Sequence, residues 1–147
     1  MDDKTKRLIA RALRAAESSV TYGTNLTSPV QVADYLKLRV AGLEYEVFGA
    51  VWLTSQHSVI ETQELFRGTI GQTSVYPREV VKAGLAANAA ACVLFHNHPS
   101  GVRDPSRADE YLTQTLKTAL ALVDIRVLDH LVLAGSRHTS FAERGLI

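Results

Sequence analysis

The chain has 147 residues, a length that favours one globular domain because two separate hydrophobic cores would not fit. Its 16 Lys and Arg residues against 15 Asp and Glu residues leave a net charge of +1, which excludes a long tail of one charge sign. A single cysteine excludes an internal disulfide, and the absence of a long apolar run or leader pattern predicts a cytoplasmic protein without a membrane contact.

The N-terminal segment predicts an amphipathic helix over Lys4–Ala16. A positive stripe runs along one side of this helix: Lys4, Arg7, Arg11 and Arg14. Such a stripe is typical of a solvated helix face, and it is also a pattern that neutralises phosphates, so a weak contact with DNA is an alternative. We expect residues 1–28 to form this helix and a connector, and residues 29–147 to form the main domain.

The next part of the chain predicts a short helix that begins near Pro29 and is closed by Gly42. The period then changes, and the β-branched and aromatic run Val47–Leu53 predicts a strand. Val59–Ile60 begins a second strand, which we expect to be its hairpin partner, and a further extended piece ends at Val75–Tyr76.

Pro77 predicts the start of a helix that an alanine-rich stretch continues to Ala91. The continuous apolar run Ala91–Phe95 is typical of a strand buried on both faces, and His96 stands at its far end. A long helix is predicted from Ser106 to Val123.

The C-terminal part predicts a strand over Val127–Leu133 and a short tail over Ser140–Ile147. Helices therefore alternate with apolar strands along the chain. This order predicts one α/β (α+β) domain with a mixed β-sheet flanked by helices.

A polar segment directly after the buried strand carries the strongest functional signal. Because side chains alternate along a strand, His96 and His98 are expected on the same side, where they can share one ion. Ser106 and Asp109 form a capping pair at the start of the next helix. Asp109 also begins the row that we expect to face the interior, with Leu112, Leu116, Ala119 and Val123.

Two imidazoles and one carboxylate are the ligand set of a catalytic zinc, which keeps a fourth position for water. The same set also suits ferrous iron. Zinc lowers the pKa of a bound water to about 7, so hydrolysis needs one more group that moves protons. Glu46 is the candidate because it heads an apolar strand, and it competes with Glu44, Glu61 and Glu64, of which Glu64 is the reserve.

These residues together resemble a known motif. Glu46, His96-x-His98-Pro99, six residues, Ser106, two residues and Asp109 resemble the JAMM motif of the JAB/MPN metalloprotease superfamily. Further segments over roughly residues 30–147 resemble its RadC branch: Tyr45–Phe48, Glu64–Thr69, Val75–Val80, His96–Gly101 and Leu128–His130. The stretch before them is too short for the helix-hairpin-helix region of many RadC proteins, so the resemblance is to the short prophage- or plasmid-type form.

The resemblance implies a deaminase-like MPN fold with zinc held by His96, His98 and Asp109. It implies that Glu46 is the general acid/base and that Ser106 helps to stabilise the oxyanion during hydrolysis of a peptide or isopeptide bond. RadC proteins also carry a DNA-repair label. A nucleic-acid-associated or partner-binding module with a structural or vestigial metal site is therefore the alternative, and the oligomeric state is left open.

Three histidines and the single cysteine lie outside this motif. His130, beside Asp129, can orient a metal ligand, but a histidine satisfied inside a strand is the simpler interpretation. His57 and His138 lie among polar residues and are expected to be exposed. Cys92 lies inside the apolar run and is expected to be a core residue.

Overall fold

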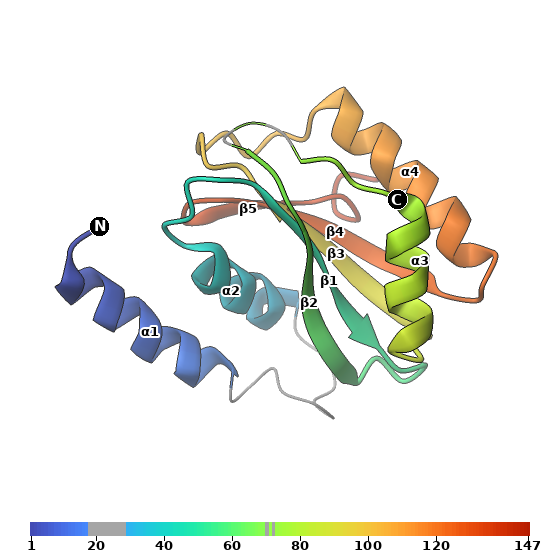
Figure 1. The fold of residues 1–147 in the computed structure, drawn as a ribbon, viewed down its shortest axis with the longest axis horizontal. Coiled ribbons are helices and arrows are strands. Elements are labelled where there is room, and N and C mark those ends of the chain that lie inside the picture. Colours follow the sequence, from blue (N-terminus) through green and yellow to red (C-terminus); the bar gives the residue numbers. More distant parts are fainter. Residues whose placement is uncertain (18–28, 70, 72) are drawn as a thin grey trace.

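The computed structural model describes residues 1–17, 29–69, 71 and 73–147, so the connector predicted before residue 29 lies largely outside the described residues (Figure 1). The helices are α1 (Asp3–Glu17), α2 (Pro29–Val40), α3 (Pro77–Ala86) and α4 (Arg107–Ala121). The strands are β1 (Val47–Leu53), β2 (Val59–Arg67), β3 (Ala91–Asn97), β4 (Arg126–Ala134) and β5 (Arg137–Ser140).

The strands form one mixed sheet in the order β2-β1-β3-β4-β5. β1 is antiparallel to β2 and β3, β3 is parallel to β4, and β4 is antiparallel to β5. β1 and β3 are buried along their whole length, as expected for central strands covered on both faces. The prediction of a mixed sheet flanked by helices is confirmed.

Helices cover both faces of the sheet (Figure 1). On one face, α2 packs through Val32 and Leu36 against β1, β3 and β4, and α1 lies outside α2. On the other face, α3 and α4 pack through Val80, Leu116 and Leu120. Because side chains alternate along each strand, residues of β3 and β4 one position apart face different helices. This parity decides which strand residues can meet α4.

The C-terminal end differs from its prediction. β4 turns through Gly135, whose φ is +63°, into β5, which pairs antiparallel with it from Ala134↔Arg137 to Leu131↔Ser140. The two residues between the strands match a short hairpin loop, a signal that the prediction of a tail from Ser140 did not use. The segment after β5 is also fixed, since Phe141 is fully buried.

One further prediction needs correction. The alanine-rich stretch does not continue α3 to Ala91, because the helix ends at Ala86 and Asn88 adopts a φ of +54°. Ala91 instead begins β3 and pairs with β1 and β4, so sheet pairing overrides helix propensity. The extended piece predicted to end at Val75–Tyr76 lies outside the sheet in its described residues, and Tyr76 has extended backbone angles, with φ −104° and ψ 111°.

Several side chains differ in burial from expectation. His57 and His138 are half-buried rather than exposed, the former in a turn and the latter on β5. On α1 the apolar face is only partly covered, because Leu13 packs against the core while Leu8 is 54% exposed. Cys92 is fully buried as predicted, and burial raises the pKa of its thiol to about 12. Over the described ranges, every helix is too short or too polar to span a membrane.

Candidate metal centre

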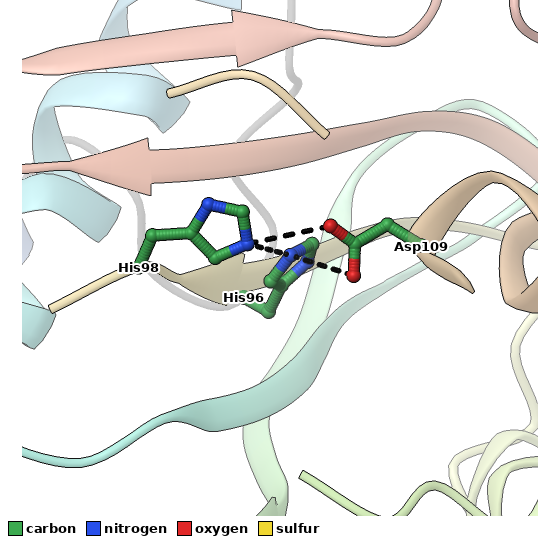
Figure 2. Close-up of side chains that lie close together, drawn as sticks. All are labelled: His96, His98 and Asp109. Atoms are coloured by element: carbon green, nitrogen blue, oxygen red, sulfur yellow. Dashed lines mark hydrogen bonds and ion pairs between the residues drawn. The ribbon is translucent and has the colours of Figure 1, made fainter. Parts of the chain in front are cut away.

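Three side chains from β3, the residue after it and α4 converge at the C-terminal end of β3 (Figure 2). His96 is the second-last residue of β3, His98 follows directly after that strand, and Asp109 is in the first turn of α4. The backbone N–H of His98 donates to the carbonyl of Leu133 on β4, so the residue stays tied to the sheet beyond the end of β3. The predicted convergence of these three residues is observed.

The spacing of the three groups fits a small divalent cation. The two Nε2 atoms are 3.0 Å apart, His96 Nε2 is 3.4 Å from Asp109 Oδ1, and His98 Nε2 is 3.3 Å from Asp109 Oδ2. Donors of a tetrahedral zinc with bonds of about 2.0–2.1 Å lie about 3.3–3.4 Å apart. The two carboxylate distances run to different oxygens, and one ligand atom from each of the three residues lies within 4.8 Å of the others, so the three side chains can share one ion after small rotations.

Asp109 is held by the start of α4. Its backbone N–H donates to Ser106 Oγ at 3.0 Å, and its Oδ2 accepts the N–H of Ser106 at 2.8 Å, which completes a capping box. The capping and metal-site interpretations of Asp109 are therefore compatible. The expected inward row needs one correction, because Thr113 and Leu120 are fully buried whereas Ala119 and Val123 are half-buried.

The hydrogen bonds of His98 leave one ring nitrogen for a metal. Its Nδ1 lies 2.7 Å from the carbonyl oxygen of Val102, which only accepts, so Nδ1 carries a proton. In the metal-free protein the hydrogen bond that His98 donates to Asp109 raises the pKa of His98, burial opposes this, and the negative charges of Asp109 and Glu46 add to the rise. Nε2 is thus directed at the carboxylate, where a metal ion would replace a proton.

The pKa of Asp109 reflects the same cluster. Burial raises the pKa of the carboxyl, but its contacts with the rings of His96 and His98 and the N–H of Ser106 together lower it. The carboxylate is therefore ionised at neutral pH and can act as a ligand.

Glu46 lies immediately before β1, half-buried, and close enough for its charge to raise the pKa of His98. Its Oε2 accepts a hydrogen bond from Thr73 Oγ1 at 3.1 Å, and its backbone N–H donates to the carbonyl of Thr69 at 2.8 Å.

The other three candidate glutamates have different surroundings. Glu64 pairs with Arg39 at 3.4 Å, while Glu44 and Glu61 are exposed. Glu46 is thus the glutamate whose charge acts on the cluster.

Asn97 is a residue of the site that the sequence interpretation missed. It is 3% exposed, its Oδ1 accepts the N–H of Val47 at 2.7 Å, and its Nδ2 donates to the carbonyl of Tyr45 at 3.0 Å. It therefore holds the backbone on both sides of Glu46 from a position between the two histidines. Its place as the middle residue of His-x-His was the available signal.

His130 was also set aside, although the structure places it behind His96. It is fully buried, and its Nε2 lies 2.7 Å from His96 Nδ1. Its Nδ1 lies 2.6 Å from Thr113 Oγ1, a hydroxyl on α4 that the sequence interpretation did not consider. Burial and the neighbouring His96 lower the pKa of His130, so its ring is neutral. His130 and His96 project from the same face of the sheet because of the register of β4 against β3, which the sequence alone did not supply.

A cavity of about 290 Å³ lies beside the cluster. It is bounded by Gly42 and Leu43 in the turn after α2, by Asn97 at the end of β3, and by His98 and Pro99 directly after that strand. His98 is therefore the member of the cluster that borders this cavity.

Comparison with known proteins identifies related sequences. The family model for the RadC-like JAB domain matches residues 26–146. A UPF0758 protein of Leptothrix cholodnii is 57% identical over 136 residues, which cover 92% of this chain and 61% of that protein. UPF0758 proteins of Dechloromonas aromatica and Thiobacillus denitrificans are 56% and 58% identical, each over 91% of this chain and 60% of the relative. The chain thus spans about 60% of the length of these relatives.

Proposed function

This chain belongs to the RadC-like JAB domain family, and from that premise we propose that it is a metal-dependent hydrolase of peptide or isopeptide bonds. The observation that carries the proposal is the convergence of His96, His98 and Asp109 at distances of 3.0–3.4 Å. The proposed ion is zinc, since two imidazoles and one carboxylate form a common catalytic zinc set.

The proposed chemistry divides the work between the metal and the chain. When bound, zinc supplies a Lewis acid beside the scissile carbonyl and activates water at neutral pH. Glu46 accepts the proton that the attacking water loses and transfers it to the leaving amine. Thr73 donates to Oε2 of Glu46 and so orients the carboxylate for both transfers.

Ser106 is proposed to stabilise the oxyanion. Its Oγ accepts the N–H of Asp109, which leaves the hydroxyl proton available to donate to the tetrahedral oxygen. Ser106 is exposed at the start of α4, so a substrate can reach it. Capping and oxyanion stabilisation can therefore coexist on this one hydroxyl.

Two variants test the proposal. His98→Ala should abolish binding of about one zinc per chain, measured by elemental analysis after zinc reconstitution and dialysis. Glu46→Gln should keep the zinc and lower hydrolysis of a panel of fluorogenic peptides and isopeptide-linked peptides by about 10²–10⁴-fold, the usual contribution of a general acid/base.

Glu64→Gln is the matched control, because it removes a nearby carboxylate that already pairs with Arg39. It should keep both zinc and hydrolysis. Wild-type protein that binds no zinc after reconstitution would overturn the metal site, and undiminished hydrolysis in Glu46→Gln would overturn the role of Glu46.

A second candidate function is a DNA contact through α1. The positive stripe of this helix is exposed along its length: Lys4, Arg7, Arg11 and Arg14. Exposed cations in a row neutralise phosphates without reading sequence, so the proposed contact is weak and sensitive to salt.

A further inference from the structure

A buried chain of hydrogen bonds connects the two elements that carry the metal centre. It begins at the backbone carbonyl of Asp109, which lies 2.8 Å from Thr113 Oγ1. It continues over 2.6 Å to His130 Nδ1 and from His130 Nε2 over 2.7 Å to His96 Nδ1. Thr113 and His130 are both fully buried, so water does not compete for these groups.

The chemistry of the four groups favours one order of protons. The carbonyl of Asp109 can only accept, so Thr113 donates its single hydroxyl proton to it. Thr113 Oγ1 then accepts from His130, whose Nδ1 must carry the proton. A neutral imidazole has one N–H, so His130 Nε2 is an acceptor and receives the Nδ1 proton of His96.

This order of protons determines the state of Nε2, the other ring nitrogen of His96. With its proton on Nδ1, the ring presents an unprotonated Nε2 to His98 and Asp109, which is the form that binds a metal. In the reverse order, Thr113 would donate to His130 and His130 to His96. The proton of neutral His96 would then lie on Nε2 and block the site.

Aromatic neighbours hold the ring of His130 in the orientation that this order needs. Phe141 stacks on it with ring centroids 4.6 Å apart and an interplanar angle of 20°. Phe48 forms a T-shaped contact with it, with ring centroids 5.5 Å apart. Asp129 ties down the segment that carries Phe141, because its carboxylate accepts from Ser140 Oγ at 2.6 Å and from the N–H of Ala142 at 3.0 Å.

We propose that Thr113 and His130 are positioning residues that keep the proton of His96 on Nδ1 and thereby hold its Nε2 ready for a metal ion. The inference rests on the proposed use of His96 as a metal ligand and is independent of hydrolysis. It adds two residues to the site, one from α4 and one from β4.

The direct test is the tautomer of His130 in the metal-free protein. A long-range ¹H–¹⁵N correlation spectrum of the full chain with ¹⁵N-labelled histidine identifies which ring nitrogen carries the proton. We expect Nδ1 protonated and Nε2 unprotonated in His130. A proton on Nε2 would overturn the inference.

Thr113→Val and Thr113→Ser form a matched pair, because valine keeps the shape of threonine without the hydroxyl and serine keeps the hydroxyl. Thr113→Val should shift His130 towards the Nε2–H form and weaken zinc binding by about 10–100-fold in competition with a chromophoric chelator. Thr113→Ser should retain the wild-type spectrum and affinity. An unchanged spectrum and affinity in Thr113→Val would also overturn the inference.

Comparison of His130→Leu with His130→Gln distinguishes the loss of the hydrogen-bond acceptor from the loss of the buried ring. The leucine variant should lose zinc affinity, and glutamine, whose amide oxygen can accept from His96 Nδ1, should restore part of it. Equal losses in two folded variants would contradict the acceptor role. If the His130 tautomer is as expected but no peptide is cleaved, only the proposed hydrolase function fails.

Discussion

Asn97 separates the two histidines in the sequence and connects them in space to the backbone around Glu46. Its side-chain amide bonds to the backbone of Tyr45 and Val47 and so fixes the position of the backbone that carries Glu46. His98 and Asp109 are held in the same way, by hydrogen bonds to Val102 and Ser106. Each group of the cluster is therefore oriented before a metal binds, which is the condition for precise ligation.

Asn97→Ala should separate the position of Glu46 from metal binding. It leaves the N–H of Val47 and the carbonyl of Tyr45 without their partner, so the free energy of unfolding should fall by about 1–3 kcal/mol in urea denaturation. Hydrolysis should fall while zinc affinity stays near that of the wild type. Asn97→Asp keeps the acceptor for the N–H of Val47, so its stability and hydrolysis should lie between those of the wild type and Asn97→Ala. Wild-type hydrolysis in a destabilised Asn97→Ala protein would show that this amide is structural only.

Two strands, one helix and the segment after β5 meet at the centre. Alternation along β3 and β4 brings His96 and His130 to the face that α4 covers. The first turn of α4 directs Asp109 at the same place, and Thr113 follows one turn later. The segment after β5 adds Phe141, so the end of the described chain supports the centre instead of forming a loose tail.

α1 is the element on which the DNA proposal depends. Arg7→Ala combined with Arg11→Ala should weaken binding of duplex DNA and lower the slope of log affinity against log salt by about one per lost phosphate contact. Fluorescence anisotropy over a range of salt concentrations measures both quantities. Lys82→Ala combined with Arg126→Ala removes two exposed charges elsewhere and is the control. Equal effects of the two pairs would rule out a specific role for α1.

The stability of the whole metal-free molecule should depend on pH with two opposite slopes around the unfolded pKa of histidine, about 6.5. The raised pKa of His98 means that its stabilising contribution is full below pH 6.5 and is lost as pH rises through the folded value. The lowered pKa of His130 means that the native protein loses stability as pH falls below 6.5. The lowered pKa of Asp109 extends this acid loss below about pH 3.9.

Thermal unfolding in the presence of a chelator should therefore give the highest Tm near pH 6.5. In His98→Ala, Tm should decline less as pH rises above 6.5, whereas the decline of Tm at acid pH should remain. Added zinc should raise Tm by mass action, and more at pH 8 than at pH 6 because protons compete for His98. An equal rise in His98→Ala would contradict zinc binding at this centre.

The amino-acid sequence alone is sufficient to predict the mixed sheet with its flanking helices and the family of the domain. Hydrophobic periodicity is a local property, and the spacing from His96 to Asp109 lies within one loop and one helix turn. Folding was needed to show that the charge of Glu46 acts on His98 while Glu64 pairs with Arg39, and to reveal the contacts of Asn97 and His130. The bonds of Asn97 to Val47 and of His130 to His96 join residues 50 and 34 positions apart. Such contacts depend on strand order and register, which local sequence patterns do not specify.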